Sequence, residues 1–138
     1  MTYNSNVLVK VTGNMLVGNK LETFGYQKLF AWQLADQLAH KIYNLTVNFP
    51  KDEIFGLTSQ LRRAGLSIAT NIVEGHARNN KKEFHRFLAI SLSSLAEVEY
   101  LLSFAYKRKL IADSDYQEVL ALRIQCGKVL WKLFNSQK

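Results

Sequence analysis

The residues that could catalyse a reaction or bind a metal are the histidines, the single cysteine and the carboxylates. No two of His40, His76 and His85 stand three or four residues apart, and the chain contains no HExxH motif. His76 and His85 flank a predicted turn and could approach each other, but no thiolate or carboxylate accompanies them at a ligand spacing. The sequence therefore predicts neither a metal site nor a cofactor.

Cys126 falls on an apolar stripe of a predicted helix, where a buried structural thiol is far more common than a reactive thiolate. As the only cysteine it can form no disulfide within the chain, which suits a reducing cytoplasm. Glu97 and Glu99 stand two apart on a helix and face different directions, so they do not pair as acid and base. The chain also lacks a glycine-rich phosphate loop and a GxSxG motif. We therefore predict that the protein is not an enzyme.

Positive charge is the chemical signal that remains. The 138 residues include 18 lysines and arginines against 11 aspartates and glutamates, which gives a formal net charge of +7. A surplus of this size suits RNA, another nucleic acid or another polyanion as partner. A basic protein without a polyanion ligand would have the same composition, so the position of the charges has to distinguish the two.

The candidate nucleic-acid-binding residues lie on three predicted helices and one turn: Arg62, Arg63, Arg78, Lys81, Lys82, Arg86, Arg123, Lys128 and Lys132. Helical spacing brings the group from Arg78 to Arg86 together at one end of a helix, where it can neutralise phosphates and release counterions. The alternative is a solvated face with salt bridges inside the chain. For Arg62 and Arg63 we favour this alternative and expect one of them to pair with a carboxylate such as Glu97.

The elements that carry these residues are helices, because apolar residues repeat at helical spacing from about Tyr26 onward. The pattern predicts a first helix over 26–48 that ends before Pro50, because the residue before a proline avoids the helical region. A third helix is predicted over 81–107.

The predicted ends of the other two helices follow from capping residues. A second helix starts at Asp52 and Glu53, whose charge suits a helix N-terminus, and ends at Gly75 as a C-terminal cap. Ser114, with Gln117 three residues later, predicts a capping box for the fourth helix. Small residues around Gly65 predict that another helix packs closely against the second one.

Four helices of about 20 residues with short connections predict an all-α fold, an antiparallel up-down-up-down four-helix bundle over residues 26–138. Residues 1–25 form an N-terminal extension that fits a short hairpin, an arm docked on a neighbour, or a disordered segment. The chain shows no secretory signal and no run of about 18 apolar residues. We therefore expect a cytoplasmic protein with no membrane partner.

Aromatic residues on the first and last helices exceed what a narrow core needs. Trp32 and Tyr43 belong to the first predicted helix, and Trp131 and Phe134 to the fourth. A helix that is apolar on two sides is buried on two sides, which predicts self-association. A broad core within one chain is the alternative.

The stretch FPKDEIFGLTSQLRRAGLSIATNIVEGHARNNKKEFHRFLAISLSSLAEVEYLL resembles the four-helix-bundle family named for proteins encoded in intervening sequences of bacterial 23S rRNA genes. With KLFAWQLADQLAHKIY and the fourth helix, the resemblance covers about residues 24–135. The combination of FPxxExxGLxxQxRRAxxSIxxNIxEG with FxRFL and SLAE is specific. The chain departs from the family pattern at Ala69, Val73, Leu92 and Ser93.

The resemblance implies an antiparallel four-helix bundle that assembles into a homopentamer, and it implies no enzymatic activity. Nucleic-acid binding is the usual suggestion for the family. A related branch, the accessory variability determinant proteins of diversity-generating retroelements, binds a reverse transcriptase and its template RNA. The sequence is consistent with either branch.

From the sequence we expect a non-catalytic, RNA-binding homo-oligomeric scaffold, with the accessory protein of a retroelement reverse transcriptase as one specific form. The alternative is a structural or protein-interaction oligomer that does not bind nucleic acid. The two differ in salt dependence, because nucleic-acid binding weakens by about one power of salt concentration for each phosphate contacted.

Overall fold

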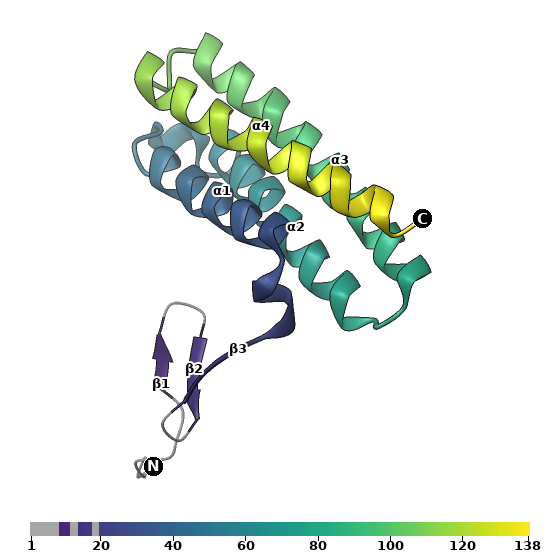
Figure 1. The fold of residues 1–138 in the computed structure, drawn as a ribbon. Coiled ribbons are helices and arrows are strands. Elements are labelled where there is room, and N and C mark those ends of the chain that lie inside the picture. Colours follow the sequence, from purple (N-terminus) through teal and green to yellow (C-terminus); the bar gives the residue numbers. More distant parts are fainter. Residues whose placement is uncertain (1–8, 12–13, 18–19) are drawn as a thin grey trace.

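A bundle of four long helices makes up most of the protein (Figure 1). The computed structural model describes residues 9–11, 14–17 and 20–138, with side chains from residue 24 onward. The long helices are α1 (Phe30–Thr46), α2 (Leu57–Ala77), α3 (Lys81–Lys107) and α4 (Asp113–Ser136). Two short 3-10 helices, η1 (Gly25–Lys28) and η2 (Lys51–Glu53), precede α1 and α2.

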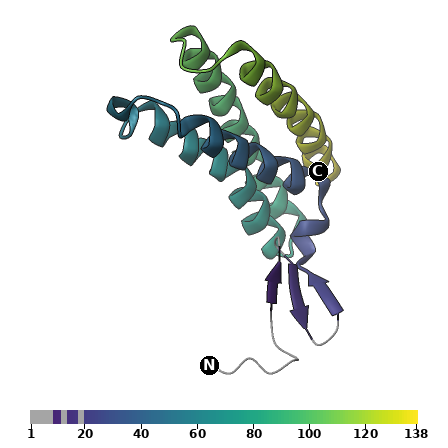
Figure 2. The same cartoon turned by 90° about the vertical axis from the view of Figure 1, so that its left-hand side faces the viewer.

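The helices follow one another around the bundle. α2 packs on α1 and α3, and α4 packs on α3 and α1, so each helix has two neighbours. The short connections over 47–56, 78–80 and 108–112 force consecutive helices to run in opposite directions. The predicted up-down-up-down topology is therefore confirmed. Figure 2 shows the helices spreading apart toward the end that carries the α1–α2 and α3–α4 connections.

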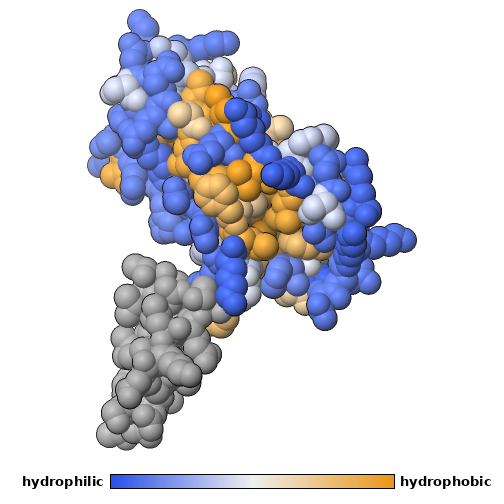
Figure 3. All heavy atoms as spheres, in the orientation of Figure 1, coloured by the Kyte–Doolittle hydropathy of each residue, from blue (hydrophilic) through white to orange (hydrophobic). Residues whose placement is uncertain are grey.

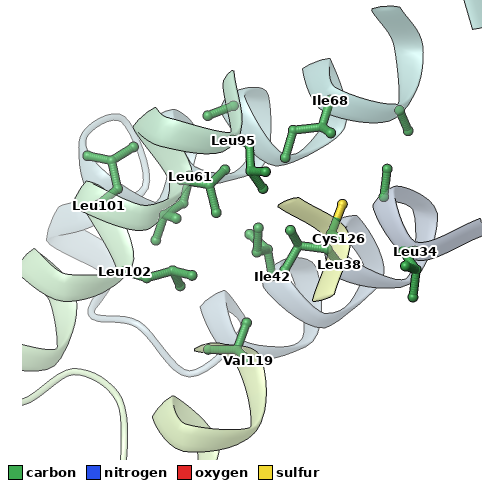
Figure 4. Close-up of a cluster of buried hydrophobic side chains, with 14 of the residues drawn as sticks. Leu34, Leu38, Ile42, Leu61, Ile68, Leu95, Leu101, Leu102, Val119 and Cys126 are labelled. Carbon is green, nitrogen blue, oxygen red and sulfur yellow. The ribbon is translucent and has the colours of Figure 1, made fainter. Parts of the chain in front are cut away.

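The core lies along the axis between the four helices (Figure 4). Each helix contributes side chains with almost no exposed area: Leu38, Ile42, Leu61, Ile68, Leu95, Leu102, Val119 and Cys126. Cys126 is buried among them, as the apolar stripe on the fourth helix predicted, and burial raises the pKa of its thiol to about 11. A thiol held in its protonated form is a packing group and a poor nucleophile.

The small residues of α2 allow its neighbours to approach closely, as predicted. A Cβ atom on Gly65 would lie 2.7 Å from Cδ1 of Ile42 on α1. On the other side, the Ser91 hydroxyl of α3 donates to the Ile68 carbonyl at 2.9 Å, and the hydroxyls of Ser67 and Ser94 lie 2.9 Å apart. Direct hydrogen bonds between a hydroxyl and a neighbouring helix require this short separation.

Gly75 does not cap α2, contrary to the prediction. The helix continues to Ala77, and Asn79 in the following turn adopts the left-handed conformation with φ of 51°. A Cβ atom on Gly75 would lie 2.6 Å from Cβ of Phe87 on α3. The glycine therefore allows two helices to touch, and Asn79 makes the turn.

The starts of α4, α2 and α1 also differ from the prediction. α4 begins at Asp113 after Ala112, which makes no side-chain cap, so the capping box predicted at Ser114 is wrong. α2 begins at Leu57, and Glu53 Oε2 accepts a hydrogen bond from its backbone N–H at 3.0 Å. Glu53 therefore supports the helix start from outside it. α1 begins at Phe30 because η1 occupies the preceding residues.

The N-terminal extension contains a three-stranded antiparallel sheet in the order β1 (Val9–Val11), β2 (Asn14–Val17) and β3 (Lys20–Thr23). Val9 faces Leu16, and Leu16 also faces Leu21. A short hairpin was one of the three expectations for this segment. The described residues form a hairpin extended by a third strand. The predictions for residues 1–8, 12–13 and 18–19 lie outside the described residues.

One helix in the described part of the chain, α3, is long and apolar enough to cross a membrane by length and composition. Its most apolar window is 44% buried against the other helices. A core helix of a bundle has the same hydropathy, and the buried residues of α3 pack against the other helices.

Candidate nucleic-acid interface

The structure divides the candidate basic residues into three groups. One group, here called the turn cluster, lies around the α2–α3 turn and consists of Arg78, Lys81, Lys82 and Arg86. The second lies on α2 and the third on α4. All four members of the turn cluster are exposed. The α2–α3 turn places these four residues close together in the sequence and in the fold.

The short turn over 78–80 fixes the turn cluster in place. Asn79 is in the left-handed conformation, and the Asn80 side chain accepts a hydrogen bond from the Glu83 backbone N–H at 2.9 Å, which caps α3. Arg78 immediately follows α2, and Lys81 and Lys82 open α3. The turn and the first two turns of α3 therefore place four positive groups within nine residues of the chain.

Both arginines of the turn cluster lie over one aromatic ring. The guanidinium carbons of Arg78 and Arg86 are 5.2 Å and 4.6 Å from the centroid of the Phe87 ring. Phe87 is only 6% exposed, so the ring is held in the bundle. Arginine stacked through its flat face keeps the N–H donors at its edge available to bind phosphate. Phe87 was not singled out from the sequence, although it stands beside Arg86 in the motif FxRFL.

Glu83 is the acidic residue within the turn cluster. Its carboxylate pairs with Arg86 at 2.8 Å, and the hydrogen bond from Arg86 lowers the pKa of Glu83. Desolvation of the carboxylate is the next-largest effect and opposes this shift, and the charges of Arg86, Arg78 and Lys82 lower the pKa further. Within residues 24–138, no carboxylate lies within ion-pair distance of Arg78, Lys81 or Lys82. The cluster therefore keeps a clear positive charge.

The two histidines beside the turn have separate aromatic partners. His76 packs edge to face on Phe84 at 5.9 Å between ring centroids, and His85 stacks on Phe134 of α4 at 4.1 Å. Among residues 24–138, the buried Nε2 of His85 has no hydrogen-bond partner. Nowhere in the described residues do three or more histidine, cysteine or acidic side chains gather in a way that could hold a metal ion.

Arg62 and Arg63 on α2 differ in their surroundings. Arg62 is half-buried, donates to Thr46 Oγ1 at 2.8 Å and lies 4.7 Å from the Tyr43 ring centroid, so it ties α2 to α1. Arg63 is exposed and lines a hollow of about 350 Å³ together with Glu97. Neither arginine pairs with a carboxylate of residues 24–138, so the expected ion pair is wrong there. The hydroxyl of Thr46 takes the place of a carboxylate as partner of Arg62.

The basic residues of α4 also separate. Arg123 is half-buried, and its Nη2 pairs with Glu99 Oε2 of α3 at 2.6 Å, which joins the two helices. Lys128 and Lys132 are exposed. Lys132 borders an apolar groove of about 290 Å³ between α1 and α4. These cations are spread along α4, and its C-terminal end lies beside the α2–α3 turn, where Gln137 and Lys81 line one hollow.

The predicted excess of aromatic surface falls on α1 and α4. Phe30 is 51% exposed and Trp131 is 56% exposed, whereas Trp32 and Phe134 pack against the core. Figure 3 shows apolar side chains gathered in a band on the face that α1 and α4 form. The groove that Lys132 borders is lined by Phe30, Leu133 and their neighbours on this same pair of helices.

Comparison with known proteins identifies the family. Residues 27–132 match the family described as 23S rRNA-intervening sequence protein. The crystal structure of a protein with unknown function from the S23 ribosomal protein family of Bacteroides thetaiotaomicron has the same fold, with 24% identity and a TM-score of 0.67 over 75% of this chain and 97% of that chain. No curated protein gives a significant match. The family match runs from before α1 to within the last turns of α4, and the chain therefore belongs to the 23S rRNA-intervening sequence protein family.

Proposed function

We propose that the protein is a non-catalytic, RNA-binding scaffold and that the turn cluster makes its main phosphate contacts. The observation that carries the proposal is the convergence of Arg78 and Arg86 on the buried Phe87 ring beside two exposed lysines. Preorganised cations lose little side-chain freedom on binding, so each phosphate contact costs less entropy. The formal net charge of +7 adds a long-range attraction to polyanions.

Self-association is the second part of the proposal. The exposed Phe30 and Trp131 and the apolar groove between α1 and α4 provide surface for a second copy of the chain. The family resemblance suggests a homopentamer. Several turn clusters held in one assembly would bind one RNA with higher avidity than a single cluster, because each later contact is intramolecular.

The resemblance also suggests a protein partner and a location. As an accessory protein of a retroelement, the chain would act in the cytoplasm beside a reverse transcriptase and its template RNA, without membrane contact. The chemistry that the described residues offer is charge and packing, which suits an accessory role.

RNA binding across a salt series, with the mass of the assembly measured in the same solutions, tests the proposal. The variant Arg78→Ala/Lys82→Ala should lower RNA affinity and reduce the slope of log K against log salt by about two, one for each lost phosphate contact. The assembly mass should stay unchanged, because both residues are exposed. Unchanged affinity in this variant would contradict the assignment.

Lys51→Ala is the matched control for a single charge. Lys51 is exposed and opens η2, between α1 and α2, away from the α2–α3 turn. It removes the same charge as Lys82→Ala, but the slope of log K against log salt should stay nearly the same as in the wild type. Equal losses in both variants would mean that net charge, and not the turn cluster, drives binding.

An oligomer that binds only protein is the alternative function, and the apolar band on α1 and α4 is the observation that favours it. Such a protein would bind no RNA even at low salt and would still assemble. Phe30→Ser/Trp131→Ser should then reduce the assembly mass, and neither this variant nor the wild type should bind RNA.

A further inference from the structure

Two exposed aromatic rings lie on the C-terminal half of α3, on the side that faces away from the core. Tyr100 is 65% exposed and Phe104 is 44% exposed, and their ring centroids are 6.3 Å apart at a tilt of 43°. The buried residues of the same turns are Leu101, Leu102 and Ala105. The two rings stand one helical turn apart on one stripe and are left uncovered by the bundle.

Three positive residues continue this stripe at the end of the helix. Lys107, Arg108 and Lys109 are all exposed, and Arg108 stands one turn beyond Phe104. No carboxylate among residues 24–138 lies within ion-pair distance of any of the three. Cations suit the negative C-terminal end of a helix dipole, but that does not account for the aromatic rings beside them.

Backbone hydrogen bonds order the C-terminal end of α3, which carries these three side chains. Lys109 N–H donates to the Tyr106 carbonyl at 2.9 Å, and Leu110 N–H donates to the Ala105 carbonyl at 3.0 Å. Lys109 is left-handed, with φ of 62°. This pattern is a Schellman motif, although the left-handed position usually holds glycine. A lysine in that position is held there at some cost in strain.

A hollow of about 640 Å³ lies beside the same positive residues, between the ends of α3 and α4. Lys107 and Lys109 line it, together with Tyr106 and Asp113. The Tyr106 hydroxyl donates a hydrogen bond to Asp113 Oδ1, so the carboxylate in the hollow already has a partner. The lysines are the charged groups of the hollow that have no partner within residues 24–138, and an anion fits them.

We infer that Tyr100, Phe104, Lys107, Arg108 and Lys109 form a second RNA contact that binds unpaired bases, here called the stacking surface. Exposed aromatic rings stack on bases that are free of their own helix, and neighbouring cations bind the phosphates between them. Bases inside a duplex stack on each other, so their faces are not available to these rings. The inference rests on the proposed RNA-binding function and adds that the RNA has a single-stranded part.

Charge favours RNA over a protein surface as the occupant. A second copy of this chain is itself basic, with 18 lysines and arginines against 11 acidic residues, so it has few acids to pair with three more cations. Cations buried at an interface without partners would cost free energy. RNA provides one negative charge for each nucleotide and a base face for each ring.

The stacking surface and the turn cluster lie near opposite ends of α3. A helix from residue 86 to residue 107 rises about 30 Å, since each residue adds about 1.5 Å. One RNA molecule with a single-stranded part next to a folded part could contact both. The two surfaces can therefore be tested separately with probes that carry only one kind of RNA.

The test uses the full chain and two labelled RNA probes, a 12-nucleotide unstructured single strand and a 12-base-pair duplex. Tyr100→Leu/Phe104→Leu keeps the apolar surface and removes the rings. We expect it to lower single-strand affinity about tenfold or more, with duplex affinity changed less than about twofold. The control variant Tyr100→Phe/Phe104→Tyr keeps both rings and should retain binding.

Charge variants and the assembly mass complete the test. Lys107→Gln/Lys109→Gln should lower the salt slope for the single strand. The inference is overturned if Tyr100→Leu/Phe104→Leu binds the single strand as tightly as the wild type does. It is also overturned if this variant has a lower assembly mass that accounts for its lost binding. If Arg78→Ala/Lys82→Ala lowers the affinity for both probes and Tyr100→Leu/Phe104→Leu lowers it for neither, only the stacking surface is ruled out. If neither probe binds the wild type at low salt, the proposed function fails as well.

Discussion

Arg78 lies in the turn after α2 and Arg86 lies on α3, and both are over the same Phe87 ring, at 5.2 Å and 4.6 Å from its centroid. The short turn over 78–80 brings the helices together, and the ring then fixes where both guanidinium groups stand. Two positive groups are placed around one ring in this way. Glu83 pairs with Arg86, whereas Arg78 has no carboxylate partner within residues 24–138 and can bind a phosphate through charge-assisted hydrogen bonds.

The first prediction concerns the Phe87 ring as a support for these arginines. Phe87→Leu keeps an apolar side chain in the core but removes the attraction of the ring for both guanidinium groups. We expect RNA affinity to fall by about fivefold to thirtyfold, because two cation–π contacts at about 0.5–1 kcal/mol each are lost. Titration of the duplex probe at fixed salt measures it.

The matched control for Phe87→Leu is Phe84→Leu, which changes the ring that packs on His76 and not on an arginine. It should leave RNA affinity unchanged while costing similar stability. Equal losses of affinity in both variants would mean that general loosening of the α2–α3 end is responsible.

The second prediction concerns Glu83, which offsets part of the charge of the turn cluster. The hydrogen bond and charge of Arg86 lower the pKa of Glu83, so the carboxylate is ionised at neutral pH. Glu83→Gln removes this negative charge and frees Arg86 for phosphate, so we expect RNA affinity to increase. The Asn80 cap uses the backbone N–H of residue 83 and is retained in the variant.

The pH dependence of Glu83 has a definite sign. A lowered pKa means that ionised Glu83 stabilises the folded chain above the unfolded pKa, and this contribution is lost as pH falls through the folded pKa. Thermal unfolding of the wild type and Glu83→Gln should therefore converge in acid. Binding of the variant that is weaker than that of the wild type at neutral pH would contradict the role given to Glu83.

The third prediction concerns Gly75 and the contact of α2 with α3. An added Cβ would lie 2.6 Å from Cβ of Phe87 and 2.9 Å from Cδ1 of Phe84. Alanine gains about 1 kcal/mol in helix propensity, but overpacking against a fixed Cβ costs about 1–3 kcal/mol. We expect Gly75→Ala to lower the free energy of unfolding, as measured by denaturant titration.

Gly127→Ala is the control for this prediction. Its added Cβ would lie 3.3 Å from Cδ2 of Leu95, the flexible end of a side chain that can shift. Stability should stay the same or increase by up to about 1 kcal/mol from helix propensity. A Gly75→Ala protein that is as stable as Gly127→Ala would show that α3 can move away, and that the close contact is not required.

Gly75 also shows which features the sequence could predict. The helical period and the turn residues predicted α3 at Lys81–Lys107 with the bounds that the structure has, because both signals are local. Gly75 fits a helix end by the same local logic, but its packing against Phe87 depends on a contact between helices. The start of α4 at Asp113 likewise follows from the Schellman turn at Lys109, which the capping pattern at Ser114 does not reveal.

The candidate interface divides in the same way. The proximity of Arg78 and Arg86 could be predicted, since the short turn makes it local. The partners of Arg62 and Arg123 depend on neighbouring helices, so the hydroxyl of Thr46 and the carboxylate of Glu99 were not predicted. A charge count treats all these residues alike, whereas the packing separates those that join helices from those that face solvent.

The last prediction concerns Cys126 and alkaline pH. Burial raises the pKa of its thiol from 9.0 to about 11, with a smaller opposing effect of the Arg123 charge. The folded chain therefore keeps the proton where the unfolded chain loses it, so stability is complete below pH 9 and falls as pH rises toward 11. The raised pKa corresponds to a loss of about 2–3 kcal/mol over this range. Cys126→Ala starts from a lower stability because it leaves a cavity. Its free energy of unfolding should fall less steeply than that of the wild type between pH 8.5 and 10.5 in denaturant titrations. Titration of lysine and tyrosine is common to both proteins and does not produce this difference. Parallel curves would mean that water reaches the thiol in the folded bundle, and rapid alkylation of Cys126 in the native protein would then accompany them.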